Sequence, residues 1–184
     1  MKTARLLITK DCHRDCPYCC NKYERVMEQI QEIDSLDALE GFGAICITGG
    51  EPLLDFDRTF RIVMKLQEKT KAKIYLYTTI YVKGTTLLLS MLDGINFTLH
   101  NEVSAKDSLY LRNMQRTLTL YDHVGRPQTN RLLISPDLET YLYIIPAVWN
   151  RITVEPWKSE DELMKQNSNN GIPANETMFF LKGE

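Results

Sequence analysis

The sequence predicts an α/β protein in which six parallel strands form a partial barrel that is open on one side. Two observations support this prediction. Short apolar runs alternate with segments of helical periodicity along most of the chain, and the residues of distinctive chemistry follow the first two of these runs. Such alternation is typical of right-handed βαβ units with a parallel sheet. Six units with strongly curved strands close only part of a barrel, a (β/α)6 architecture.

The predicted strands are short, as expected for buried parallel strands. The run at 44–48 is apolar on both faces, which is typical of a strand covered on both sides. The predicted strands are 4–9, 44–48, 73–78, 95–99, 131–135 and 151–155.

The predicted helices lie between the strands. The clearest spans 57–69, where Phe60, Val63 and Met64 mark one face and Asp57 is the expected N-cap. Tyr23 begins an apolar spacing that predicts a helix over 21–33. The remaining helical segments are 85–92, 104–121 and part of 138–149.

Length and composition fit one domain with a sizeable core. The chain has 184 residues, 43% of them hydrophobic and 25% charged. We expect a single domain over 1–184, with its barrel at about 4–155 and a C-terminal tail at 156–184 that could cover the barrel. The net charge of −2 gives no signal for nucleic-acid binding.

Targeting signals are not evident in the sequence. No apolar run approaches the ~20 residues that span a bilayer, and the N-terminus lacks a signal-peptide pattern. Five cysteines, four of them within nine residues, do not resemble a disulfide framework. We therefore expect a protein of the reducing cytoplasm with no membrane partner.

The chemistry-bearing residues begin with C-H-R-D-C-P-Y-C at 12–19, directly after the first predicted strand. Thiolates of Cys12, Cys16 and Cys19 can hold three irons of a [4Fe–4S] cluster and leave the fourth iron without a protein ligand. An open iron is a place for chemistry, as an open position is on catalytic zinc. The alternative is a zinc knuckle with Cys20 or His13 as fourth ligand, although zinc usually takes its ligands as two separated pairs.

This spacing resembles the signature of the radical S-adenosylmethionine (radical SAM) superfamily, which has an aromatic residue before the third cysteine, as Tyr18 is here. A second match follows the second predicted strand, where the family carries a Gly-Gly-Glu element. The resemblance covers roughly 4–155. It implies the same partial barrel, a [4Fe–4S] cluster and S-adenosylmethionine (SAM) as cofactors, and a SAM amino acid moiety that chelates the open iron.

The resemblance also implies roles for the segment Thr48-Gly49-Gly50-Glu51 in binding SAM. Gly49 and Gly50 would let the backbone approach the ligand closely, because they lack side chains. Glu51 would accept a charge-assisted hydrogen bond from the methionyl ammonium. The alternative for the two glycines is a plain turn from strand to loop.

Other cofactor contacts follow from the resemblance less directly. Tyr18 would lie near the adenine, or pack within the loop, or both. Thr78 and Thr79 end the third predicted strand, where the family often places a small polar residue on the ribose, but threonine is also common at strand ends. Thr98 and His100 end the fourth strand and would face the same cavity.

Two cysteines remain outside the predicted ligand set. We interpret Cys20 as a bystander at the start of the following helix and Cys46 as a small buried thiol. No side chain is assigned a catalytic acid–base role, and no later cysteine cluster predicts a second iron–sulfur centre.

The resemblance implies that a flavodoxin or ferredoxin supplies an electron and that SAM is cleaved to methionine and a 5′-deoxyadenosyl radical, which takes hydrogen from a substrate. We favour a protein or peptide substrate, because few residues are available to cover the barrel. A small molecule or nucleotide, as in deazapurine-pathway synthases, is the alternative. A non-catalytic iron–sulfur or zinc binding module is the third reading, against which Glu51 after two glycines argues.

Overall fold

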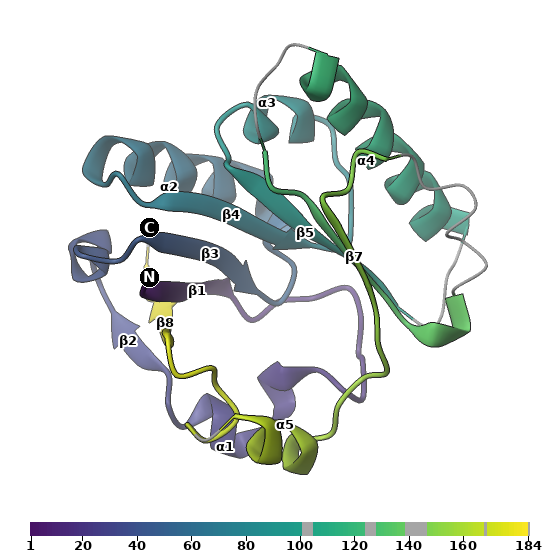
Figure 1. Ribbon diagram of the computed structural model, residues 1–184. Coiled ribbons are helices and arrows are strands. Elements are labelled where there is room, and N and C mark those ends of the chain that lie inside the picture. Colours follow the sequence, from purple (N-terminus) through teal and green to yellow (C-terminus); the bar gives the residue numbers. More distant parts are fainter. Residues whose placement is uncertain (101–104, 124–127, 139–146, 168, 184) are drawn as a thin grey trace. The chain divides into compact units, whose positions relative to one another are not determined.

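The computed structural model describes residues 1–100, 105–123, 128–138, 147–167 and 169–183 (Figure 1). Contacts within the chain group these residues into two compact units. The first unit consists of Met1–Ile74 and Trp157–Glu184, and the second of Tyr75–Pro156. Within the described residues no helix is long and apolar enough to cross a membrane.

The first unit is built on four parallel strands in the order β2-β8-β1-β3. Its strands are β1 (Thr3–Thr9), β2 (Gln31–Ile33), β3 (Ala44–Gly49) and β8 (Glu176–Leu181). Its helices are α1 (Glu24–Met27), α2 (Phe56–Lys69) and α5 (Glu160–Gln166), with 3-10 turns η1 (Cys20–Lys22), η2 (Leu36–Leu39) and η3 (Pro52–Asp55).

Strand β1 lies at the centre of this unit, with β8 on one side and β3 on the other. Its apolar residues Leu6, Leu7 and Ile8 are buried, as expected for a strand covered on both faces. Helix α2 buries a face formed by Thr59, Ile62, Val63 and Leu66, so of the predicted stripe only Val63 is buried, while Phe60 is half-buried and Met64 is exposed. The N-cap is Asp55, whose carboxylate accepts the Arg58 N–H, and not Asp57. The end of β1, where the cysteine loop begins, is therefore fixed by neighbours on two sides.

Two strands of this unit were not predicted. The predicted helix over 21–33 is wrong beyond its first turns: α1 ends at Met27, and Gln31–Ile33 pairs with β8 as strand β2. The C-terminal segment contributes β8 itself, inserted between β1 and β2. Both strands depend on partners far away in the sequence, which local periodicity cannot reveal.

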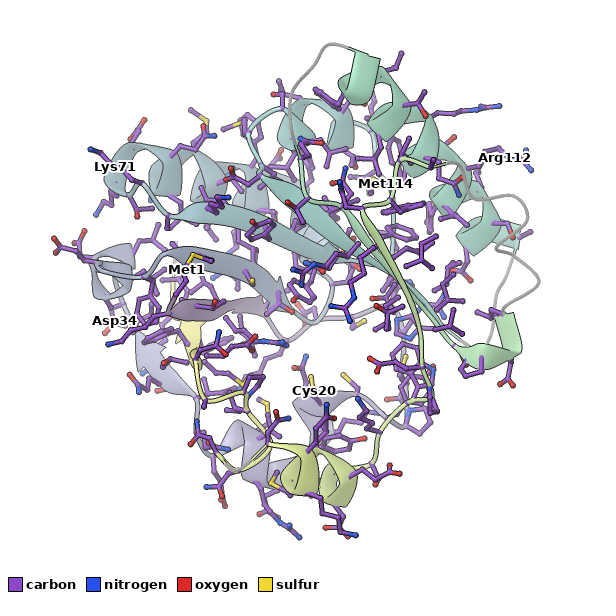
Figure 2. The ribbon with its side chains drawn as sticks, in the orientation of Figure 1. Met1, Cys20, Asp34, Lys71, Arg112 and Met114 are labelled. Atoms are coloured by element: carbon purple, nitrogen blue, oxygen red, sulfur yellow. The ribbon has the colours of Figure 1, made fainter. Side chains whose placement is uncertain are left out.

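The second unit has four parallel strands in the order β4-β5-β6-β7. Its strands are β4 (Lys73–Thr78, beginning at the end of the first unit), β5 (Gly94–Leu99), β6 (Arg131–Ile134) and β7 (Arg151–Val154), and its helices are α3 (Thr85–Leu89) and α4 (Ala105–His123). Met114 of α4 is fully buried toward the strands, whereas Arg112 points away from them (Figure 2). The helical expectation for 138–149 falls mainly on 139–146, outside the described residues.

The predicted fold class is confirmed. Within each unit the described pairings between strands are all parallel, and the strand order is linear and not circular, so the strands form an open and not a closed arrangement. The described residues form eight strands and not six, because β2 and β8 add to those expected. In parallel α/β folds functional residues gather at the carboxyl ends of strands, and the cysteine loop and the Gly-Gly-Glu segment follow β1 and β3 in this way.

Candidate cofactor site

The three cysteines of the motif lie on the loop that leaves β1 in the first unit. None of the three is in a disulfide, and Cys12 is exposed while Cys16 and Cys19 are half-buried. A tight turn is closed where the Cys19 N–H donates to the Cys16 carbonyl at 3.2 Å, and the Lys22 N–H then donates to the Cys19 carbonyl at 2.9 Å. The loop therefore folds back on itself at the second and third thiols.

The thiols of this loop influence one another electrostatically. Burial raises the pKa of Cys12 above its ordinary value, and Glu51 and Cys19 raise it further, against the opposing effect of Arg14. Burial likewise raises the pKa of Cys16, with Arg14 opposing it. Both thiols are thus protonated near neutral pH, and a bound metal must displace these protons.

The three thiols of the motif have the donor chemistry that an iron–sulfur cluster takes. Among the described residues, no three or more His, Cys, Asp or Glu side chains form a group that could hold one metal ion. Thiolates that bind three different irons of a cube-shaped cluster need not converge on one point. Cys12, Cys16 and Cys19 are soft ligands on one loop, as an iron–sulfur cluster requires.

Backbone hydrogen bonds join the Gly-Gly-Glu segment to the start of the cysteine loop. The Gly50 N–H donates to the Thr9 carbonyl at 2.8 Å, and the Glu51 N–H donates to the Asp11 carbonyl at 2.7 Å. A Cβ on Gly49 would lie 2.3 Å from the Thr9 oxygen, and a Cβ on Gly50 would lie 2.0 Å from the Asp11 oxygen. The close approach that these glycines permit is therefore to the backbone of the cysteine loop itself.

The carboxylate of Glu51 is buried beside the first thiol. The residue is 1% exposed, and its Oε1 accepts the Leu53 N–H at 3.1 Å, which caps the turn η3. Its charge is close enough to Cys12 to raise the pKa of that thiol. The two sequence motifs thus meet backbone to backbone, and the charge of Glu51 acts on the thiol of Cys12.

Asn21 is a site residue that the sequence did not reveal. Its Nδ2 donates to the Gly49 carbonyl at 2.6 Å, which ties the end of the cysteine loop to the glycine segment. At the other end of the loop, the Asp11 N–H donates to the hydroxyl of Thr9 at 3.0 Å. Asn21 lies in a segment expected to be helical, so no local signal distinguished it.

Trp157 is a second residue that sequence reasoning missed. Its ring stacks on Tyr18 with centroids 4.5 Å apart and an interplanar angle of 1°. The two residues are 139 positions apart, so only the folded chain brings them together. Tyr18 thus packs on the C-terminal segment, and its place near the adenine stays a prediction.

The predicted threonines occupy different surroundings. Thr48 is half-buried on β3, in register with Leu7 of β1. Thr78 ends β4 in the second unit and is buried, with its Oγ1 3.2 Å from the Ile80 nitrogen and 3.3 Å from the Ile80 oxygen, so it serves the local turn. Thr79 follows it and is half-buried.

The remaining candidate residues are Thr98, His100, Cys46 and Cys20. Thr98 of β5 and His100 after it are half-buried in the second unit. Cys46 is buried in β3, as predicted. Cys20 opens η1 (Figure 2), and burial raises the pKa of its thiol, which lies 3.8 Å from Oδ1 of Asn21.

Comparisons with known proteins identify a family and a similar fold for this chain. The family model of the radical SAM superfamily matches residues 6–119. The crystal structure of Streptococcus suis SuiB bound to S-adenosylmethionine is similar, with a TM-score of 0.54 and 16% identity, over 98% of this chain and 47% of that one. At this identity the likeness shows the fold alone, and the chain spans about half the length of that protein. No curated protein matches the chain.

Proposed function

Because the chain belongs to the radical SAM superfamily, we propose that it is an enzyme in which Cys12, Cys16 and Cys19 hold a [4Fe–4S] cluster. The family implies this cluster and SAM as its cofactors. The single observation that carries the residue assignment is the pair of backbone hydrogen bonds from Gly50 and Glu51 to the start of the cysteine loop. These bonds hold the two motifs together in one unit.

The residues of the chain have positioning roles in this proposal. When bound, the cluster and SAM supply reductive cleavage to methionine and a 5′-deoxyadenosyl radical that abstracts hydrogen from the substrate. Glu51 accepts a hydrogen bond from the methionyl ammonium, which its burial makes stronger. Gly49 and Gly50 keep the cysteine loop close to β3.

The remaining assignments rest on the family pattern. Tyr18 lies beside the adenine, Thr48 borders the glycine segment, and Thr78 or Thr79 contacts the ribose. The electron comes from a flavodoxin or ferredoxin. An oxygen-sensitive cluster on cysteines that form no disulfide suits a reducing cytoplasm.

A protein or peptide is the substrate that we propose, and the outer strand β7 supports it. The Arg151 N–H donates to the Asn130 carbonyl and the Glu155 N–H to the Ile134 carbonyl, so alternate residues direct their backbone groups away from β6. The residues at these alternate positions are Ile152 and Val154, which are 41% and 37% exposed. An extended peptide could add to this edge as a further strand.

A small molecule is the second candidate substrate, and a row of polar residues across the strands of the second unit supports it. Tyr77, Asn96 and Arg131 are neighbours in register across β4, β5 and β6, and they form a polar row. Such a row would suit hydrogen bonding to a compact polar molecule.

One assay distinguishes the two candidate substrate classes. It measures how much 5′-deoxyadenosine forms from SAM in the presence of a strong reductant. A peptide substrate predicts that Val154→Pro, which removes an N–H from the outer edge, lowers peptide-stimulated formation and leaves slow uncoupled formation intact. Asn96→Ala should instead be the damaging change for a small molecule. If no 5′-deoxyadenosine forms from SAM in the wild type, the proposed radical chemistry is wrong.

A further inference from the structure

The side chain of Asn21 fastens the far end of the cysteine loop to the Gly-Gly-Glu segment. Its Nδ2 donates to the Gly49 carbonyl at 2.6 Å, although the two residues are 28 positions apart in the sequence. The contact is partly buried, so water competes for it less than at an exposed site. Because Asn21 follows Cys19 by two residues, the contact lies next to the third proposed cluster ligand.

The opposite side of the same carboxamide has a partner as well. The Cys20 thiol lies 3.8 Å from Oδ1 of Asn21 and donates to it. A backbone carbonyl can only accept a hydrogen bond, so the amide nitrogen and not the amide oxygen must face Gly49, and the thiol can donate to the oxygen on the other side. The surroundings of Asn21 therefore direct its N–H donor at the glycine segment.

With this contact, the cysteine loop is tied to one short segment at both of its ends. At the start of the loop, the N–H groups of Gly50 and Glu51 form the two backbone hydrogen bonds described above. At the end of the loop, Asn21 provides a link. Loss of the Asn21 side chain would leave the bonds at the start in place and remove the link beside Cys19.

We propose that Asn21 is a positioning residue that fixes the cysteine loop against the Gly-Gly-Glu segment, so that the cluster and Glu51 can contact the same SAM molecule. The inference rests on the proposed function, in which the open iron binds the amino acid moiety of SAM and Glu51 accepts a hydrogen bond from its ammonium group. Two such contacts form together at low cost only if their spacing is fixed before SAM binds, because ordering them on binding lowers the affinity. Asn21 supplies part of that fixed spacing.

The test is a SAM titration of the reduced, reconstituted full chain, followed by the change in its EPR spectrum, with iron content measured in parallel. Asn21→Asp keeps the shape of the side chain but has no N–H to donate when it is ionised, and Asn21→Ala removes the carboxamide. Asn21→Gln keeps an amide donor on a longer side chain. Asn167→Asp is the matched control, because Nδ2 of Asn167 donates to the Gly171 carbonyl at 3.1 Å in the same unit but outside both motifs.

We expect Asn21→Asp and Asn21→Ala to keep the wild-type iron content and to raise the half-saturating SAM concentration about tenfold, as for the loss of one hydrogen bond. Asn21→Gln should stay closer to the wild type than either of them, and Asn167→Asp should match the wild type. If Asn21→Asp and Asn21→Ala lose the cluster, retention of iron and of the SAM response by Asn21→Gln also supports the role.

Three results would overturn the inference. They are half-saturation of Asn21→Ala at the wild-type SAM concentration, an equal weakening of SAM binding in Asn167→Asp, and cluster loss from Asn21→Gln. Failure of the wild-type chain to assemble an iron–sulfur cluster, or a wild-type spectrum that does not respond to SAM, would instead overturn the proposed function on which the inference rests. The two failures are therefore distinguishable.

Discussion

At the scale of single residues, Gly49 and Gly50 at the end of β3 must lack a Cβ for a structural reason, which is separate from their place in a family motif. Gly50 has no room for a Cβ, because the Asp11 oxygen would be 2.0 Å away. Backbone atoms cannot yield as a flexible side chain can. Gly50 therefore helps to hold the cysteine loop before any cofactor binds.

Gly50→Ala should accordingly destabilise the metal-free chain by about 1–3 kcal/mol, the usual cost of overpacking, and lower iron uptake. Gly41→Ala is the control: Gly41 has a φ of +83° but nothing within 4 Å of a Cβ, so its cost comes from conformation alone. Urea unfolding of both variants measures the difference. Equal iron uptake by Gly50→Ala and wild type would contradict the role of Gly50 in holding the cysteine loop.

Glu51 caps η3 and is proposed to bind SAM, and a substitution can separate these two roles. Glu51→Gln keeps an oxygen to cap η3 but loses the charge, so SAM binding should weaken by roughly 1.5–3 kcal/mol, typical of a hydrogen bond to a charged group, while the cluster remains. The pKa of Cys12 should fall, because the carboxylate raises it. Faster alkylation of Cys12 in the metal-free variant at mildly alkaline pH would show this, and an unchanged rate would count against the proximity of these two groups.

At the scale of elements, the C-terminal segment is part of the core of the first unit. Leu181 at the end of β8 is fully buried, and β8 pairs with both β1 and β2. Residues 178–181 are apolar in the sequence, but a strand that inserts between two others has no local signature. The three-residue strand β2 was hidden for the same reason, because its hydrogen bonds go to β8.

Leu181→Ala should therefore lower the free energy of unfolding by about 2–5 kcal/mol, as expected for a buried leucine. The exposed Leu120 of α4 is the comparison, and its replacement by alanine should change stability by less than ~0.5 kcal/mol. Denaturant unfolding checks both values. Similar small effects at the two sites would mean that β8 only covers the unit.

At the scale of the whole molecule, the open parallel α/β fold followed from the sequence because alternating strands and helices constrain topology strongly. The cysteine loop and the glycine segment were also evident, since each is a short local pattern after a predicted strand. Asn21 and Trp157 were not, because their importance comes from a carbonyl and a ring that only folding brings near. Local motifs thus indicated the candidate site, and the contacts that stabilise its loop are long-range.

The role of Cys20 bears on the same site. It directly follows Cys19, and a fourth thiolate would close the open iron of the cluster. Cys20→Ser should keep the iron content and the 5′-deoxyadenosine yield near wild type, because adjacent residues direct their side chains about 100° apart in a helical turn. Halved iron content in this variant would make Cys20 a ligand.

The most direct test of the central claim is the EPR spectrum of the reduced, anaerobically reconstituted chain with and without SAM. The account predicts about four irons per chain, a spectrum that changes when SAM is added, and loss of both on replacing Cys12, Cys16 or Cys19 with alanine while Cys46→Ala has no effect. Stoichiometric zinc in place of iron would contradict the account. So would a wild-type spectrum that is indifferent to SAM.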